Sequence, residues 1–237
     1  MSRQPPVQQP PPAQRIRLRY FKQGPARFAS QQDFARAFER ALRRAHTPMA
    51  YSSGFSPHPR ISYSNSVPTG VASRAEYLEI ALARPIDPEL ARAELNRVLP
   101  RGFQIMAAVE ADGGALAESL THSLWGIELG VAGLAEATAV FLAADEVIVR
   151  RMGKSGVREF NVRETVVALE AESGAALLRA VTGPGKIVAR PSDVLAGLCA
   201  VSPALAIPGV PLATRLAQGS WVDGQVHDLF GPSESLG

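Results

Sequence analysis

The stretch "YSSGFSPHPR" holds side chains that suit contact with nucleic acid. It places Tyr51, Ser53, His58 and Arg60 within ten residues. Arginine and serine side chains donate hydrogen bonds to phosphate oxygens, and an exposed tyrosine can stack on a base. The stretch therefore predicts a phosphate-binding loop. The alternative is a proline-rich loop that only packs on its sheet.

Four arginines precede this loop on a segment with helical periodicity, "SQQDFARAFERALRRAH". Apolar residues recur every three or four positions and form the expected core face. Arg36, Arg40, Arg43 and Arg44 fall away from that face. Ser30 is the expected N-cap of this helix. We expect these guanidinium groups and those of the loop to converge on one positive face.

The charge of the chain is distributed unevenly. From Arg15 to Arg60 there are ten basic residues and two acidic ones, whereas from Ile61 onward there are 14 basic and 20 acidic residues. A basic patch on a weakly acidic body is typical of polyanion-binding proteins. Ordinary solvated surface charge is the alternative interpretation.

The elements that must position these residues follow a repeated order. Period-two alternation predicts strands at 15–23, 76–83 and 102–111, with a further strand at 60–64. Helices are predicted at 30–46 and, after Asp87 and Pro88, at 87–99. Strands and helices from 123 to 221 repeat this order, with a strand at 146–152 after the first helix of this half. We therefore predict an α+β fold of tandem ferredoxin-like (βαββαβ) modules with antiparallel sheets. The expected segments are a disordered tail at 1–14, modules at 15–113 and 120–222, and a flexible tail at 223–237.

The connection after the first helix is longer than a simple turn requires. Pro48, Pro57 and Pro59 stiffen it, and Gly54 can supply a left-handed turn. Phe55 is expected to anchor the loop to the core. The loop should therefore be ordered.

A second group of polar residues lies in the later half of the chain. Asn161 and Arg163 occur in "FNVRET", and Lys186 and Arg190 occur in "TGPGKIVARP". The latter lacks the Gly-Lys-Ser/Thr of a phosphate loop. These four residues are a possible second binding site, or they form a buried network and an ordinary connection.

The remaining composition excludes several classes of site. Cys199 is the only cysteine, so the chain has no disulfide framework. No histidine–carboxylate spacing of the zinc type occurs, and we expect neither a metal nor a cofactor. No apolar run has the length of a membrane helix, and no signal peptide is recognisable. We expect a cytoplasmic protein that does not bind membranes.

The segments "RALRRA", "YSSGFSPHPRIS" and "PTGVASRAEYLEI" resemble the radical-SAM-linked protein family, a bacterial family without an assigned molecular function. The resemblance covers Arg15 to Leu82 most clearly. It implies a module that is fused to a radical SAM domain in many members and stands alone in others, mostly actinobacterial. This chain lacks the three-cysteine motif of such enzymes. The resemblance therefore implies a non-catalytic accessory protein that recognises RNA and works with a separately encoded radical SAM enzyme, in RNA or ribosome modification.

The first half is also similar, more distantly, to the CRISPR repeat-processing endoribonucleases. That similarity implies a metal-independent endoribonuclease with His46, Tyr51 and His58 as catalytic candidates. A histidine suits this work because its usual pKa, about 6.5, lies close to the operating pH. A third hypothesis is a scaffold that binds a protein partner.

Overall fold

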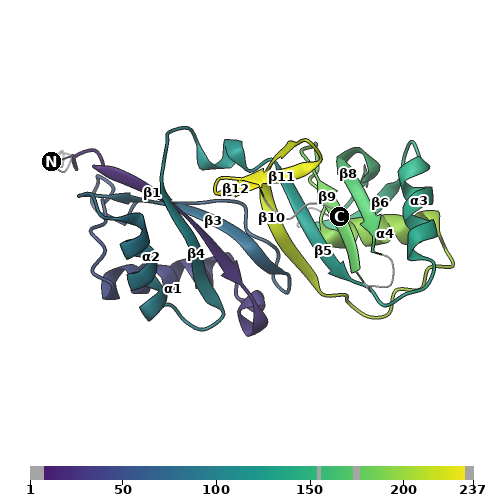
Figure 1. The fold of residues 1–237 in the computed structure, drawn as a ribbon, viewed down its shortest axis with the longest axis horizontal. Helices are drawn as coiled ribbons and strands as arrows, with labels where there is room; N and C mark the ends of the chain where they lie inside the picture. Colours follow the sequence, from purple (N-terminus) through teal and green to yellow (C-terminus); the bar gives the residue numbers. More distant parts are fainter. Residues whose placement is uncertain (1–7, 154–155, 173–176, 233–237) are drawn as a thin grey trace. The chain divides into compact units, whose positions relative to one another are not determined.

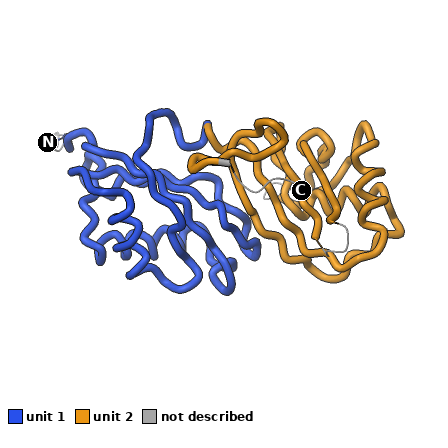
Figure 2. Tube along the Cα trace, in the orientation of Figure 1, with its two compact units in different colours: residues 1–118 blue, residues 119–237 orange. Residues whose placement is uncertain are grey.

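The computed structural model describes residues 8–153, 156–172 and 177–232. The chain divides into two compact units, Met1–Glu118 and Ser119–Gly237 (Figure 2). Both are of the α+β class. Residues 1–7 and 233–237, which belong to the expected tails, lie outside the described residues.

Unit 1 is an antiparallel sheet with two helices on one face (Figure 1). Its strands lie in the order β4–β1–β3–β2. Its elements are β1 (Gln14–Lys22), a 3-10 turn (Gly24–Phe28), α1 (Gln31–Arg44), β2 (Ile61–Tyr63), β3 (Ala72–Leu82), α2 (Pro88–Val98) and β4 (Phe103–Glu110). A short 3-10 turn (Leu116–Ser119) follows. The predicted strands and helices of this half are all present.

The core of unit 1 lies between the helices and the even-numbered side chains of β1 and β3. Ile16, Leu18, Phe38, Leu78 and Ile80 are all fully buried there. Because strand side chains alternate between faces, the odd-numbered residues of β1 point to the opposite face of the sheet. This alternation decides which arginines can share a surface.

Capping residues fix where α1 begins, as the sequence predicts. The Asp33 backbone N–H donates to Ser30 Oγ at 3.2 Å, and the Ser30 N–H donates to Asp33 Oδ2 at 3.0 Å. This reciprocal capping box satisfies two amide groups that the first turn leaves unpaired. The Ser30 hydroxyl donates to Asp33 Oδ2 at 2.7 Å, and this bond, together with the one from the Ser30 backbone N–H, lowers the pKa of the Asp33 carboxyl.

In unit 2 the neighbouring strands β10–β5–β9–β8 are antiparallel and lie in that order. Its first elements are β5 (His122–Glu128), α3 (Leu134–Ala143), β6 (Ile148–Gly153), β7 (Gly156–Asn161), a 3-10 turn (Arg163–Thr165) and β8 (Val166–Ala171). The later ones are β9 (Leu177–Thr182), α4 (Pro191–Val201), β10 (Ala213–Val222), β11 (Gln225–Asp228) and β12 (Gly231–Pro232).

Two features of unit 2 differ from the sequence predictions. The strand expected at 146–152 is β6, which pairs with β7 in a separate hairpin, while β8 occupies the place beside β9. The segment expected to be a flexible tail contains β11 and β12. Asp223 and Gly224, with φ of 49° and 75°, form a two-residue turn that joins β10 to β11. An Asp-Gly pair is a strong hairpin signal, which explains why the chain turns back here instead of continuing as a tail.

None of the helices in the described residues is both long and apolar enough to cross a membrane.

Candidate nucleic-acid interface

The outer face of α1 presents the four predicted arginines. Arg36, Arg40, Arg43 and Arg44 are all exposed, whereas Phe34, Phe38, Ala41 and Leu42 point into the core. Positions separated by three or four residues lie on one side of a helix. In the described residues none of the four forms a salt bridge. They are a stripe of free cations, which we call the α1 stripe.

Arg17, in the same basic segment, is not available to a ligand. Arg17 is 4% exposed. Its Nε lies 3.2 Å from Glu79 Oε2 and its Nη1 lies 2.8 Å from Asp112 Oδ1. Its Nη2 donates to the carbonyl oxygens of Gly113 and Gly114. The guanidinium of Arg17 therefore serves the fold.

The Tyr51–Pro59 segment is a projecting hairpin within the edge strand of unit 1. Before it, the Ala50 N–H donates to the Ala81 carbonyl at 2.8 Å, and after it the Ala81 N–H donates to the Arg60 carbonyl at 3.0 Å. Tyr51 and Pro59 form an isolated bridge at its base. The long loop is thus a strand that leaves β3 and returns to it.

A short hydrogen-bond network orders this hairpin. The Ser52 N–H donates to the His58 carbonyl at 2.9 Å, and the Ser52 hydroxyl lies 3.0 Å from His58 Nδ1. This contact leaves the Nε2 side of His58 for other partners. Ser53 Oγ accepts a hydrogen bond from the Gln9 N–H at 2.9 Å. Tyr51 is 41% exposed and Phe55 is 70% exposed, so the prediction that Phe55 anchors the loop in the core was wrong.

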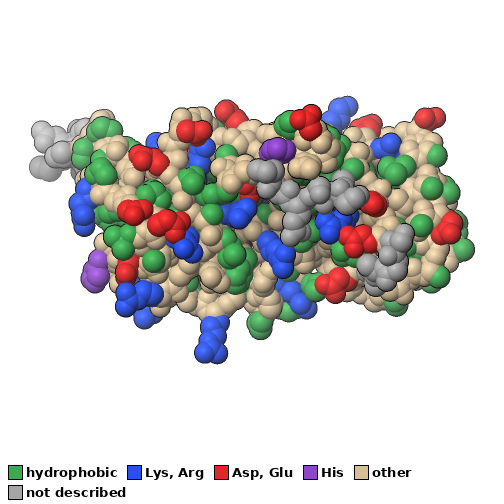
Figure 3. All heavy atoms as spheres, viewed as in Figure 1, with side chains coloured by type: hydrophobic (Ala, Val, Ile, Leu, Met, Phe, Trp, Pro, Cys, Tyr) green, Lys and Arg blue, Asp and Glu red, His purple; other side chains and the backbone are tan. Residues whose placement is uncertain are grey.

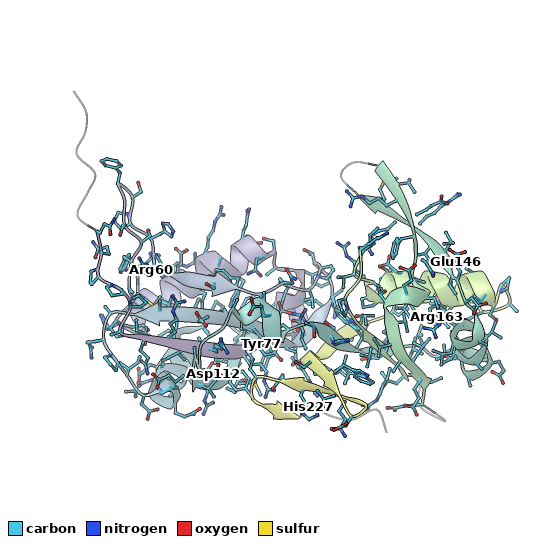
Figure 4. The ribbon with its side chains drawn as sticks, turned by 90° about the horizontal axis from the view of Figure 1, so that it is seen from above. Arg60, Tyr77, Asp112, Glu146, Arg163 and His227 are labelled. Atoms are coloured by element: carbon cyan, nitrogen blue, oxygen red, sulfur yellow. The ribbon has the colours of Figure 1, made fainter. Side chains whose placement is uncertain are left out.

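Arg60 lies in a different place from the α1 stripe. Its neighbour Ile61 packs against the helix-side core, so Arg60 points to the opposite face of the sheet. There it lines a hollow of about 290 Å³. The other lining residues are Arg15, His58, Pro59, Ile61, Ser62, Glu79 and Ala81. Figure 4 labels Arg60 at the foot of the projecting loop.

The expected single positive face is therefore split into two surfaces. The α1 stripe lies on the helix side of unit 1, whereas His58 and Arg60 lie on the other side with Arg15. Arg15 is itself bound to Glu79 Oε1 at 2.8 Å. On the face drawn in Figure 3, lysine and arginine side chains are interspersed with aspartate and glutamate.

The three catalytic candidates are not assembled in this hollow. His58 lines it, but His46 and Tyr51 do not. His46 is exposed just past the end of α1, with a φ of 50°. General acid–base catalysis would most simply use two histidines in one site. Among the residues that line this hollow, only His58 is a histidine.

The four residues of the possible second site have different roles. Asn161 Oδ1 accepts hydrogen bonds from the backbone N–H groups of Val147 and Arg163. The Arg163 guanidinium, labelled in Figure 4, donates to the carbonyls of Val166 and Leu142.

The side chains of Asn161 and Arg163 therefore bond to backbone groups within unit 2 and serve its fold. Lys186 is exposed on the connection before α4. Arg190 alone of the four lines a hollow, together with Arg151 and Arg158.

Sequence reasoning missed Arg151 and Arg158. They lie directly opposite each other on β6 and β7. The signal was the presence of arginines in both "VRRM" and "VREF", whose positions become informative only once the two strands are paired. No group of three or more potential metal ligands occurs among the residues that the structure describes.

Comparison with known proteins gives a family and no activity. The family model described as "Uncharacterized protein conserved in bacteria (DUF2344)" matches residues 15–191, a range that includes α1 and the projecting loop. No curated protein matches the chain. A solved structure described as an unknown protein from Galdieria sulphuraria has 17% identity and a TM-score of 0.25, covering 84% of this chain and 98% of that one. A likeness at that TM-score carries no argument about this chain.

Proposed function

The chain belongs to the DUF2344 family of uncharacterized bacterial proteins, and we propose that it is a non-catalytic protein that recognises RNA. The observation that carries the proposal is the α1 stripe, whose arginines are exposed and form no salt bridge in the described residues. The phosphate backbone of a nucleic acid is the usual partner of such a stripe.

The stripe contains like-charge repulsion, which Asp33 beside Arg36 and Glu39 four residues before Arg43 offset in part. Arg36 and Arg40, and Arg40 and Arg44, are like-charged pairs four residues apart. Each such pair destabilises a helix by about 0.2–0.5 kcal/mol. Only Arg43 and Arg44, in the last turn, gain from the helix dipole. An acidic ligand along α1 would relieve the repulsion.

The spacing of the stripe suits several phosphates at once. Residues four apart on a helix are displaced by about 6 Å along its axis, so Arg36, Arg40 and Arg44 form a ladder of positive charge. Arginine also forms paired hydrogen bonds with phosphate oxygens. On the other side of unit 1, Arg60, His58 and the exposed Tyr51 and Phe55 provide a second contact region for a strand of RNA.

The proposed partner is a separately encoded radical SAM enzyme that modifies RNA or the ribosome. The support for this part is the resemblance of Arg15–Leu82 to the radical-SAM-linked family. In that arrangement this chain would hold the RNA and the enzyme would perform the chemistry. We further propose that both units are ferredoxin-like. The strand orders β4–β1–β3–β2 and β10–β5–β9–β8 support this, with β6–β7 as an insertion in unit 2.

The proposal is tested by RNA binding at two salt concentrations. If four phosphates are neutralised, affinity for a single-stranded RNA should fall about fifty-fold between 50 and 200 mM NaCl. Arg40→Glu should weaken binding at low salt and flatten the salt dependence. Arg101→Glu, an exposed arginine of the same unit outside the stripe, is the matched control.

Three results would count against this function. They are binding that does not depend on salt, an equal loss in Arg101→Glu, and co-purification of a protein partner without nucleic acid. Incubation of the RNA in EDTA examines the endoribonuclease alternative. Cleavage that disappears in His58→Ala would replace the accessory role with a catalytic one.

A further inference from the structure

We propose that a hollow in unit 2, between the β6–β7 hairpin and the segment before α4, binds a nucleotide. Its volume is about 620 Å³, within the range of small-molecule sites. The lining residues are Arg151, Met152, Gly153, Arg158, Phe160, Ile187 and Arg190. The inference does not depend on the proposed function, because no residue of α1 takes part.

All charged side chains that line this hollow are arginines. Arg151 and Arg158 are direct cross-strand partners in the β6–β7 register. Like charges placed directly opposite on a sheet are destabilising. Arg190, which is exposed, has no salt-bridge partner among the described residues. The Asp193 carboxylate compensates the charge of Arg151, and an anion held by the three guanidinium groups would further offset the excess of positive charge in this hollow.

A buried carboxylate holds Arg151 in place. Its Nε donates to Asp193 Oδ1 at 3.1 Å, and its Nη2 lies 2.8 Å from Asp193 Oδ2. The Arg151 Nη2 also donates to the Val188 carbonyl at 3.0 Å. The Asp193 side chain is 5% exposed. Arg151 is therefore pre-organised, and the structure gives its Nη1 group no hydrogen-bond partner among the described residues.

The same carboxylate positions the third arginine. The Arg190 backbone N–H donates to Asp193 Oδ2 at 2.7 Å. Asp193 thus ties the base of Arg190 to the guanidinium of Arg151. One buried acid that does not itself line the hollow thus holds the guanidinium of Arg151 and the backbone of Arg190. This is a built site rather than scattered surface charge.

An aromatic ring adjoins the cations. The guanidinium carbon of Arg151 lies 4.8 Å from the centre of the Phe160 ring. Ile187 adds apolar surface to the lining. Phosphate oxygens would bind the guanidinium groups, and a planar base would pack on the aromatic and apolar side. The combination fits a nucleotide better than it fits inorganic phosphate alone.

The opposite face of the same hairpin supplies a matched control. Arg150 alternates with Arg151 and so points away from the hollow. It is paired with Glu159 at 2.6 Å. Figure 4 shows the hairpin projecting from the body of unit 2. Arg150→Ala therefore removes one arginine from the hairpin without touching the proposed site.

The test is calorimetric titration of the full chain with ADP, pyrophosphate and adenosine at 50 mM NaCl. ADP should bind the wild type and Arg150→Ala equally. Arg190→Ala should weaken ADP binding about tenfold, since one charge-assisted contact is lost. Phe160→Leu should weaken ADP but leave pyrophosphate unchanged. Arg40→Glu should bind ADP like the wild type, which separates this site from the RNA-binding face.

Absence of ADP binding at millimolar concentration would overturn the proposal. So would an equal loss in Arg150→Ala and Arg190→Ala, or adenosine binding as tight as ADP. Pyrophosphate binding as tight as ADP would show that the ring is not recognised, and would also overturn it. Because Arg190 is exposed, its variant should fold like the wild type. Thermal unfolding of Phe160→Leu shows whether its weaker ADP binding comes from the lost ring or from a loss of folded protein.

Discussion

Arginines that look alike in the sequence have opposite roles in the structure. Arg17 and Arg40 lie in the same basic segment, yet one is buried and bound to Glu79 and Asp112 and the other is exposed without a salt bridge among the described residues. A guanidinium that is both buried and neutralised, as that of Arg17 is, cannot contact an anion at the surface. The excess of basic over acidic residues in Arg15–Arg60 therefore overstates the positive potential at the protein surface.

Arg17→Lys should lower the free energy of unfolding by about 2 kcal/mol. Lysine keeps the charge, but a single ammonium group cannot replace a planar guanidinium that contacts two carboxylates and two carbonyls. Urea unfolding measures the change. The control is Arg40→Lys, an exposed site where the same substitution should leave the midpoint unchanged. Equal midpoints for the two variants would contradict the role of Arg17.

His122 should make unit 2 sensitive to mild acid. Burial lowers the pKa of His122, so the folded state holds a proton on this ring less readily than the unfolded chain, whose histidines have a pKa of about 6.5. Stability is then present above that value and is lost as the pH falls below it. Between pH 7.5 and 5.5, His122→Gln should lose less unfolding free energy than the wild type.

The measurement for His122 is urea unfolding at both pH values. His46→Gln, an exposed histidine at the end of α1, is the control and should follow the wild type. If all three proteins lose stability in parallel, burial of His122 does not contribute to the pH dependence.

At the scale of elements, α1 and the loop after it were predictable to different degrees. The periodicity of 30–46 and the Ser30 cap define a helix and its exposed side from local residues alone. The loop is different, because its position depends on a strand that is distant in the sequence. Its ends pair with each other, through the Arg60 N–H and the Ala50 carbonyl at 2.9 Å, and both ends also pair with Ala81 of β3. Whether Arg60 faces the helices or the opposite side depends on its pairing with Ala81, which lies on a distant strand.

Close packing between α3 and α4 depends on Gly197. A Cβ at this position would lie 2.7 Å from the Phe141 ring and 3.0 Å from Val162. Gly197→Ala should therefore destabilise the protein by about 1 kcal/mol, since overpacking costs about 1–3 kcal/mol and the gain in helix propensity returns only about 1 kcal/mol.

Thermal unfolding of Gly197→Ala measures the net effect of the overpacking cost and the gain in helix propensity. Ala196→Gly, on the exposed side of the same helix, reports propensity alone and should cost about 1 kcal/mol. A higher melting temperature in Gly197→Ala would mean that Phe141 moves aside without cost.

At the scale of the whole molecule, the two units carry separate candidate sites. The α1 stripe belongs to unit 1, and the arginine-lined hollow around Arg151 belongs to unit 2. The family match spans residues 15–191 and so includes both. The two binding assays use different ligands and different variants, so one proposal can fail while the other stands.

The amino-acid sequence by itself determined the helices, most strands and the exposed face of α1. These depend on neighbours within a few residues, through side-chain periodicity and capping. The tertiary structure alone decided that Arg17 is neutralised, that Arg60 is separated from the α1 stripe, and that Arg151, Arg158 and Arg190 meet. Those outcomes depend on contacts between strands and helices far apart in the chain, where one step of strand register moves a side chain to the other face.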